Sequence, residues 1–501
     1  MKIKGISTLF FSLLLMACNG GGGSDERSRD FSASFAPIDG FVHSQHATLT
    51  LDMLDGLSSV TFKVKTKDIN QATDLGVRHT IDYLQRNSAI NITDRTILMT
   101  VFGLYQDFQN TVELTLEYAN GQQVQKAFDV VTAAISDDRL PQNIDVTFRD
   151  PALRTHYFLL RSGDYGNLIM DSDGEIRWAS PDVGENIRSS FVSKDRMIQA
   201  AVRSNKVYHI RWDGSVELHS IDDPDYGRSH HTIEKGKVGL LNTVALIDGG
   251  TVLRPESDLI EMTETGQVLK AWSMDDIFNA AITGAGEDPT NFVRSGPFDW
   301  FHMNGAIYDP SDDGILVSSR ENFVAKIDYE THAIRWIMGD PRKAWYTDYP
   351  LSLQPLALTI MGNTNIGQHA LSLSQDGSQL MMFNNGWGNY QLPNVGDDRG
   401  YSLVSIYEID EIAMTATEVF SYDNVPQIYA RICSSAYYAR SGNIVVDFGG
   451  HNEMPAAIIQ VITPSQEKLF EASLPRNADQ GVACLTAHSA EEVALDSWVI
   501  D

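Results

Sequence analysis

The chain is poor in cysteine and in basic side chains. Its 501 residues include three cysteines, and 38 lysines and arginines stand against 66 aspartates and glutamates, a formal net charge of -28. This charge repels phosphate backbones and argues against a nucleic-acid partner. A small anionic substrate is compatible with it only where a local cluster of cationic groups attracts that substrate. The length excludes one ordinary compact domain, so a large repeat fold or several domains are expected.

Long apolar runs are also scarce. The run at residues 9–16 is too short to span a bilayer and follows Lys2 and Lys4, which is the order of an export signal. Leu15-Met16-Ala17-Cys18 resembles a bacterial lipoprotein cleavage box, which predicts a signal peptide over residues 1–17 and a lipid on Cys18. An ordinary signal peptide is the alternative. Removing residues 1–17 deletes two lysines and no acids, giving -30. We expect an exported protein on the periplasmic side of the bacterial envelope, membrane-bound only through its lipid anchor.

Three segments precede the main body of the chain. Residues 18–30 are rich in glycine and charge and predict a flexible tether. Residues 31–135 alternate in short strand-like pieces, which is typical of a small β-sandwich domain. Residues 136–151 are rich in Asp and Asn and predict a linker. If Cys18 is acylated, Cys433 and Cys484 are left to form a disulfide in an oxidising compartment, with two buried thiols as the alternative.

Residues 152–501 repeat a unit of roughly 40 to 60 residues, which consists of four strands separated by turns. Six copies end in a turn and a closing strand, at 171–178, 212–218, 263–272, 328–336, 409–420 and 463–470. Units of this size close radially, so the fold class is all-β, a six-bladed β-propeller after the small sandwich. An array of β-sandwiches is the alternative. Residues 278–297 and 337–367 are the insertions expected to form loops on one rim.

Familiar catalytic motifs are mostly missing. The sequence has no phosphate-binding loop ending in Gly-Lys-Ser/Thr, no His-Glu-x-x-His helix and no Gly-x-Ser-x-Gly elbow. Nothing in it predicts a metal or another cofactor. What remains is a set of histidines just before or at the start of innermost-strand patterns: His230, His231, His302, His369 and, less regularly, His451. Innermost strands line the axis of a propeller, so these side chains are expected to converge on one site.

Arg320 ends the apolar strand pattern of residues 315–319, in the same blade as His302. A buried cation needs a partner. One interpretation is a structural ion pair with Glu321, and the other is a planar fork for the oxygens of a sulfate or phosphate. With the histidines, Arg320 would form the local cationic cluster that an anionic substrate requires.

Long strings around these residues resemble the bacterial PAPS-independent aryl-sulfate sulfotransferases, which are exported six-bladed propellers with a small N-terminal β-domain. The matching strings are residues 299–304, 308–309, 315–320, 326–327, 334–339, 367–370, 376–377 and 383–386, with 103–105 and 110–112 in the N-terminal part. The likeness covers nearly all of the mature chain. It implies an aryl sulfate donor, a phenolic acceptor, no cofactor and a possible homodimer.

The resemblance also implies roles. His369 would be the nucleophile that is transiently sulfated, and His302 and Arg320 would hold the sulfuryl oxygens with Asn304 near them. The pair His230 and His231 would supply the fourth group, and we prefer His231. The family commonly continues this pair with an aspartate and a Pro-Asn-Gly-Asn turn, which this sequence lacks. Two further hypotheses remain at this point: a quinone-dependent propeller dehydrogenase and a non-catalytic propeller adaptor of the envelope.

Overall fold

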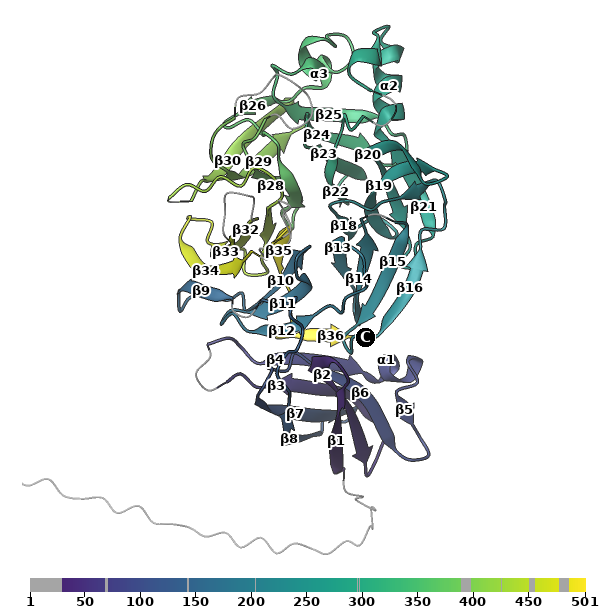
Figure 1. Ribbon diagram of the computed structural model, residues 1–501, viewed down its shortest axis with the longest axis vertical. Coiled ribbons are helices and arrows are strands. Elements are labelled where there is room, and N and C mark those ends of the chain that lie inside the picture. The colour runs from purple at the N-terminus through teal and green to yellow at the C-terminus, as the bar shows by residue number, and fades with distance from the viewer. Residues whose placement is uncertain are drawn as a thin grey trace, which may run out of the picture.

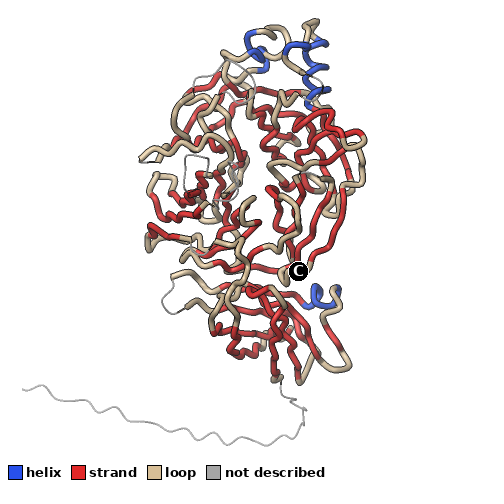
Figure 2. Tube along the Cα trace, in the orientation of Figure 1, coloured by secondary structure: helices blue, strands red, loops and turns tan. Residues whose placement is uncertain are grey.

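The computed structural model describes residues 29–67, 71–141, 144–202, 204–294, 296, 298–388, 398–424, 426–449, 456–476 and 486–501. Strands dominate, in a ring at the top of Figure 1 and a smaller layered domain below it. The helices are few and lie outside the strand layers (Figure 2). Within the described ranges, no helix has the length and apolar character needed to cross a membrane.

The N-terminal part of the described chain forms two sheets that share one core, as the sheets of a β-sandwich do. One sheet has the strand order β1-β2-β6-β5 and the other β36-β4-β3-β7-β8. Buried and partly exposed residues alternate along β7, as expected for a strand with one face in a core. The elements are β1 (Phe31–Ile38), β2 (Phe41–Leu51), β3 (Leu57–Val64), β4 (Leu75–Thr80), α1 (Ile81–Arg86), β5 (Ile90–Asn91), β6 (Thr96–Phe102), β7 (Gln109–Tyr118) and β8 (Gln123–Val131).

The rest of the described chain forms six sheets of four or five strands, and the prediction of an all-β propeller is confirmed. Blade 1 contains β10 (Tyr157–Ser162), β11 (Gly166–Asp171) and β12 (Ile176–Ala179), with β35 (Ser489–Glu492) innermost. Blade 2 contains β13 (Ile187–Val192), β14 (Arg196–Ala201), β15 (Lys206–Arg211) and β16 (Val216–Ser220). Blade 3 contains β17 (Tyr226–Gly227), β18 (Ile233–Lys235), β19 (Leu240–Asp248), β20 (Thr251–Met262) and β21 (Val268–Ser273).

The remaining blades follow the same plan. Blade 4 contains β22 (Met303–Asp309), β23 (Gly314–Ser319), β24 (Phe323–Asp328) and β25 (Ile334–Gly339). Blade 5 contains β26 (Thr359–Met361), β27 (His369–Leu373), β28 (Gln379–Asn384), β29 (Leu403–Asp410) and β30 (Thr415–Tyr422). Blade 6 contains β31 (Ser435–Tyr438), β32 (Ile444–Phe448), β33 (Ala456–Ile462) and β34 (Lys468–Pro475), with β9 (Asp145–Arg149) outermost.

The six closing segments read from the sequence lead into β12, β16, β21, β25, β30 and β34. Two other segments lie outside the expected boundaries. β9 falls within the predicted linker but pairs with β34, and β36 (Trp498–Ile500) leaves the propeller to pair with β4 of the sandwich. Both are short edge strands, and a single short edge strand leaves little periodic signal in a sequence.

The two predicted insertions carry short helices. The first insertion, residues 278–297, contains most of α2 (Met274–Gly284) and the 3-10 turn Pro289–Asn291. The second, residues 337–367, contains α3 (Ala344–Thr347) and the 3-10 turn Gln354–Leu356. The hydroxyl of Ser273 accepts the N–H of Asp276 at 3.1 Å, which caps the first turn of α2. α2 and α3 lie at the edge of the ring that is farthest from the sandwich (Figure 1).

One apolar core continues from the sandwich into the first two blades. Trp212 of blade 2 stacks on Phe102 of the sandwich with ring centroids 4.9 Å apart, and its edge meets Trp498 of β36 at 6.0 Å. Ile500, at the end of β36, is 1% exposed. The last residues of the chain therefore help to hold the two domains together.

Ile500→Ala is expected to lower the melting temperature, because truncating a buried isoleucine costs about 2 to 4 kcal/mol. Val499→Ala is the matched control, since Val499 lies on the same strand and is 47% exposed. Thermal unfolding followed by circular dichroism measures both variants. Equal melting temperatures for the two would show that β36 does not contribute to stability.

Candidate active site

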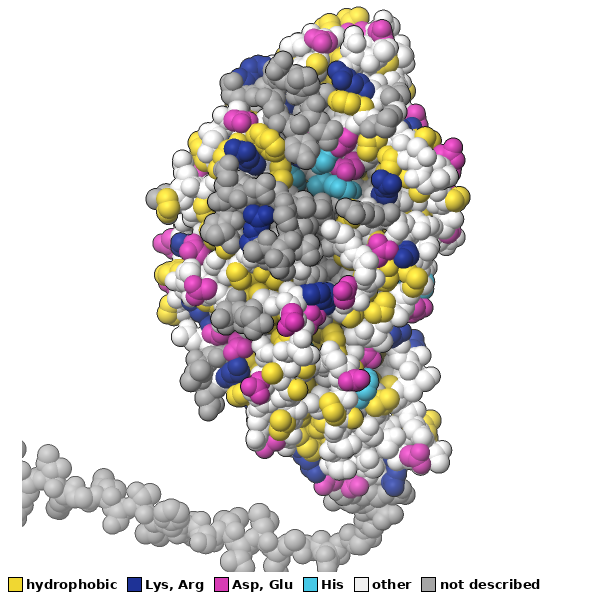
Figure 3. Space-filling model, viewed as in Figure 1, with side chains coloured by type: hydrophobic (Ala, Val, Ile, Leu, Met, Phe, Trp, Pro, Cys, Tyr) yellow, Lys and Arg dark blue, Asp and Glu magenta, His cyan; other side chains and the backbone are white. Residues whose placement is uncertain are grey.

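Histidines from four blades lie where the innermost strands begin. His302 precedes β22, His369 opens β27, and His230 and His231 precede β18. His488 lies just before β35, the strand that closes the ring. Because innermost strands surround the propeller axis, side chains far apart in the sequence meet there. Figure 3 shows histidine side chains at the centre of the ring, beside acidic ones.

The imidazoles form a row across the axis. The Nε2 atoms of His302 and His231 are 3.2 Å apart, and Nδ1 of His231 is 3.2 Å from Nε2 of His488. The ring centroids of His231 and His369 are 5.7 Å apart, and those of His230 and His231 are 4.1 Å apart. The structure thus brings together four of the five histidines that the sequence assigned to one site, and the fifth, His451, lies outside the described residues. His231 lies between the rings of the others, and His230 lies to one side.

Two carboxylates surround the Nδ1 atom of His302. It lies 2.5 Å from Oδ2 of Asp299 and 2.9 Å from Oε2 of Glu256. Burial alone lowers the pKa of His302, but the charges of Glu256 and Asp299 outweigh burial and raise the pKa to about 9. His302 is therefore an imidazolium at neutral pH, and its Nε2–H faces His231.

Glu256 also contacts His230, whose Nε2 lies 3.0 Å from Oε1 of the carboxylate. Burial opposes the charge on Glu256, but the charges of His230 and His302 prevail and hold the pKa of the carboxyl well below its usual range. Glu256 is therefore an ionised group that links the histidines of two blades.

His231 is neutral, because burial and then the neighbouring histidines hold its pKa well below the usual range. Its Nε2 accepts the Nε2–H of the His302 imidazolium, so its own proton lies on Nδ1 and is donated to His488. This assignment of protons follows from the charge on His302.

His369 is 2% exposed. Its Nδ1–H donates to Oδ1 of Asn385 at 2.8 Å, and its Nε2 accepts the backbone N–H of Cys433 at 3.2 Å. The amide of Asn385 is oriented in turn, because its Nδ2 donates to the carbonyl of Cys433 at 2.9 Å. Burial and then the charge of Arg320 lower the pKa of His369 to about 3. These contacts place the lone pair of a neutral imidazole on Nε2.

Arg320 follows β23 and is 7% exposed. Its Nε and Nη2 atoms donate to Oε1 of Glu321 at 3.0 and 2.5 Å, so the ion pair considered from the sequence is present. The ammonium of Lys343 donates to the backbone carbonyl of Glu321. The charge of Arg320 lowers the pKa of both His302 and His369, although burial is the larger cause in each. The cations of the site are therefore paired with carboxylates, and the ion pair of Arg320 with Glu321 was one of the two interpretations left open by the sequence.

Asn304 lies in the wall of a small cavity on the axis. Its Nδ2 donates to the carbonyl of Gln368 at 2.5 Å, which holds it beside His369. The cavity has a volume of about 10 Å³, room for about one water molecule. His231, His369 and His488 also line it.

Several residues of this site have a strained backbone conformation. His231, Glu256, His302 and Cys433 have φ angles of 56°, 50°, 49° and 57°, in the left-handed region that favours glycine. Such conformations cost about 1 to 3 kcal/mol each and persist where the surroundings enforce them, often at active sites. Two of these residues, His231 and His302, lie just before innermost strands, and their side chains meet at the axis.

Several site residues were missed from the sequence: Glu256, Asp299, His488, Lys343 and Asn385. His488 carries a usable signal, since it precedes the last strand of the chain and ring closure makes that strand an innermost one. Glu256 lies within the long β20 and has no comparable signal. Cys433 is in a disulfide. Its predicted partner Cys484, like Cys18 and His451, lies outside the described residues, so that pairing stays a prediction.

The molecule is a β-propeller with a buried histidine cluster on its axis, where the innermost strands begin. The model of the arylsulfotransferase (ASST) family matches residues 146–482. The chain therefore belongs to the arylsulfotransferase family, and it is a sulfotransferase.

Two curated relatives are both named arylsulfate sulfotransferase AssT. The one from Escherichia coli is 25% identical over 456 residues, covering 70% of this chain and 75% of that protein. The one from Lelliottia amnigena is 23% identical over 454 residues, with the same coverage of both chains.

Solved propellers are more distant. The Swd1 β-propeller domain from Myceliophteria thermophila matches with a TM-score of 0.35 and 13% identity, covering 67% of this chain and 90% of that one. AztD from Citrobacter koseri matches with a TM-score of 0.28 and 10% identity, covering 87% and 98%.

The charge on His302 predicts how stability depends on pH. Its pKa is raised on folding, so its contribution is fully present below about pH 6.5, the unfolded value, and is lost as the pH rises through about 9. Melting temperatures between pH 6 and 10 should fall less steeply in Glu256→Gln than in the wild type. Glu330→Gln, which removes an exposed carboxylate paired with Lys270, should keep the wild-type slope. Parallel slopes in all three proteins would contradict the assignment.

Proposed function

We propose that the protein moves a sulfuryl group from a phenolic sulfate ester to a phenol, with His369 as the nucleophile. The observation that supports this proposal most strongly is that one buried histidine on the axis, His369, is neutral while another, His302, is cationic. Membership of the arylsulfotransferase family supports the same reaction.

The first step is attack by Nε2 of His369 on sulfur. The N–S bond forms, the bond from sulfur to the aryl oxygen breaks, and its electron pair stays on the phenolate. A neutral imidazole is a competent nucleophile near neutral pH, and a sulfo-histidine divides the transfer into two easier displacements. In this step Nε2 of His369 gives up its hydrogen bond with the backbone N–H of Cys433 and bonds to sulfur instead. Asn385 keeps the other ring nitrogen protonated throughout.

His302 supplies the proton for the leaving phenolate. Its Nε2–H is the acidic group of the row, because both carboxylates contact Nδ1. After the first phenol leaves, neutral His302 takes the proton of the acceptor phenol as that oxygen attacks sulfur and the N–S bond breaks. His231 and His488 continue the row of hydrogen bonds and act as positioning residues that orient the His302 ring.

Arg320 and Asn304 are assigned to the sulfuryl oxygens. The N–H donors of a guanidinium lie in one plane, and the two that Glu321 accepts fix the orientation of that plane in Arg320. Preorganised donors of this kind stabilise charge that develops in the transition state. Glu321 and Lys343 hold the guanidinium in place.

The family match over residues 146–482 leaves a quinone-dependent dehydrogenase or a simple adaptor without support. Export, lipid attachment at Cys18 and a homodimer remain proposals that rest on the sequence and its resemblance.

The first test measures release of a chromogenic phenol from its sulfate ester, with and without a second phenol. Release that depends on the acceptor indicates transfer, and parallel lines in double-reciprocal plots indicate a two-step mechanism. His369→Ala is expected to lose at least about 1000-fold in kcat, because the covalent route is removed. His46→Ala, in the N-terminal domain, is the control. Wild-type transfer by folded His369→Ala would overturn the mechanism, as would the absence of a sulfuryl adduct on the His369 peptide in mass spectra of enzyme treated with donor alone.

A second test uses the pH profile of kcat/KM. If His302 must be protonated for the first step, activity falls as the pH rises through about 9. His302→Gln is expected to lower the rate by roughly 100- to 10,000-fold for a poor leaving group and to remove this limb. A sulfate ester whose leaving phenol is highly acidic needs less help from a proton donor, so His302→Gln should lower the rate less with that ester. An unchanged alkaline limb in His302→Gln would assign the proton to another residue.

A further inference from the structure

A second group of histidines lies on the outer half of blade 2, away from the innermost strands that carry the active site. His209 lies on β15, and Glu217 and His219 lie on the neighbouring β16. Nothing in the proposed sulfuryl transfer uses them.

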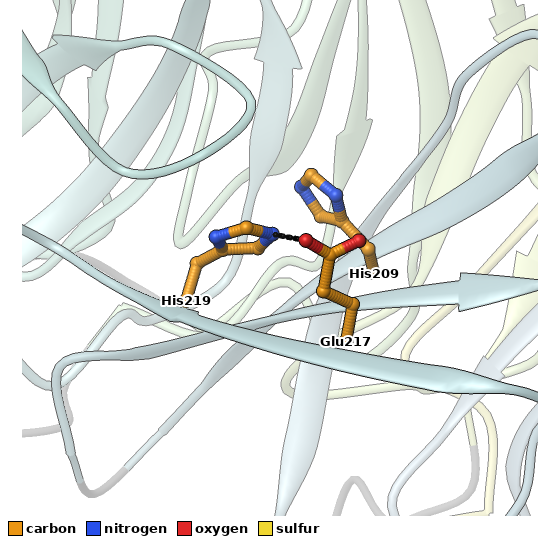
Figure 4. Close-up of side chains that lie close together, drawn as sticks. All are labelled: His209, Glu217 and His219. Atoms are coloured by element: carbon orange, nitrogen blue, oxygen red, sulfur yellow. Dashed lines mark ion pairs between the residues drawn. The ribbon is translucent and has the colours of Figure 1, made fainter.

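The pairing of the two strands puts all three side chains on one face. His209 lies directly opposite Glu217, and His219 is two residues further along β16. Side chains two apart on a strand share a face, and opposite or diagonal neighbours are within reach of each other. Figure 4 shows the three side chains turned toward one another, with the contact between His219 and Glu217 dashed.

The spacing matches a metal centre. One nitrogen or oxygen atom from each residue lies within 4.8 Å of the others. Nε2 of His219 is 3.3 Å from Oε1 of Glu217. Two ligands of a tetrahedral Zn²⁺, each at about 2.0 to 2.1 Å from the ion, are roughly 3.3 Å apart.

The hydrogen bonding of the two histidines also suits them as metal ligands. Nε2–H of His209 donates to the backbone carbonyl of Glu264 at 2.7 Å, which leaves Nδ1 as the ligand atom and fixes the ring, as a metal-bound histidine is usually fixed. Nε2 of His219 is buried and has no hydrogen-bond partner among the residues that the structure describes.

We propose that His209, Glu217 and His219 bind a divalent transition-metal ion of the Zn²⁺ type. Two imidazoles and one carboxylate are ligands that Zn²⁺, Co²⁺ and Ni²⁺ accept, whereas Ca²⁺ and Mg²⁺ prefer oxygen alone. Glu217 has a side-chain exposure of 55%, so a water molecule can complete the coordination. The ion replaces a weak contact of 3.4 Å between Nη1 of Arg196 and Nδ1 of His209, while Asp195 keeps its ion pair with Arg196.

The position of the site suggests a structural role. Glu264, whose carbonyl holds His209, belongs to blade 3, and its carboxylate accepts the hydroxyl of Ser193 from blade 2. An ion on His209 and His219 would therefore tie β15 to β16 beside the junction of two blades. A ligand that binds only the folded state stabilises it.

The test titrates Zn²⁺ into full-length protein that has been freed of metal, and measures bound metal by mass spectrometry and calorimetry. His219→Ala is expected to bind one equivalent less than the wild type and to lose the rise in melting temperature that Zn²⁺ produces. Glu217→Gln, a change at an exposed position, should weaken binding at least tenfold. Co²⁺ should give the intense visible bands of a tetrahedral site in the wild type but not in His219→Ala.

Controls separate this site from the active site, where His230, His231 and Glu256 also lie close together. His230→Ala should keep the equivalent that His219→Ala loses. Leu218→Ala, on the opposite face of β16 and 55% exposed, should bind metal like the wild type. The proposal is overturned if the wild type and Glu217→Gln bind metal equally, or if the only bound equivalent is lost in His230→Ala.

Discussion

Pairing of β35 with β10 is the interaction on which the rest of the structure depends. It places the last strand of the propeller innermost in the first blade and so closes the ring. Closure fixes the innermost strands around one axis, and the active-site histidines take their positions from the starts of those strands. The same pairing brings His488 to the site from the far end of the sequence. The chain then leaves the ring as β36 and joins the sandwich, so the fold of the N-terminal domain also includes its C-terminus.

On this axis, the environment gives the same side chain two different protonation states. His302 and His369 are both buried, and burial alone favours neutral imidazole in each. Two carboxylates reverse that preference at His302, whereas at His369 a side-chain amide replaces them and the charge of Arg320 adds to burial. The proposed proton donor and the proposed nucleophile can therefore coexist within one row of rings. His231 separates them and can accept a hydrogen bond only because it is neutral.

The sequence predicts the parts of this arrangement that repeat. A turn followed by a closing strand recurs in each blade, and Trp178, Trp272 and Trp336 lie on that strand in three of them. Histidines lie at the starts of the innermost strands of four blades. These repeats are why the propeller and the convergence of His231, His302 and His369 could be predicted. The carboxylates could not, because Glu256 reaches the axis through a positive φ angle within the long strand β20 and breaks the pattern of its neighbours. β36 was missed for a related reason: three residues that pair in parallel with a distant strand have no periodicity of their own.

The net charge of -28 does not decide how the protein recognises an anionic ester, because recognition depends on the groups in the site. Within the described site, His302 lies beside Glu256 and Asp299, and Arg320 and Lys343 lie beside Glu321, so these cations have fixed partners inside the protein. Affinity then depends on N–H groups aimed at particular oxygens, since a site of paired charges discriminates by geometry at short range. The same pairing benefits catalysis. Donors held by fixed counter-charges do not reorganise when charge moves from the ester to the leaving phenolate, and preorganisation of this kind is what lowers the barrier.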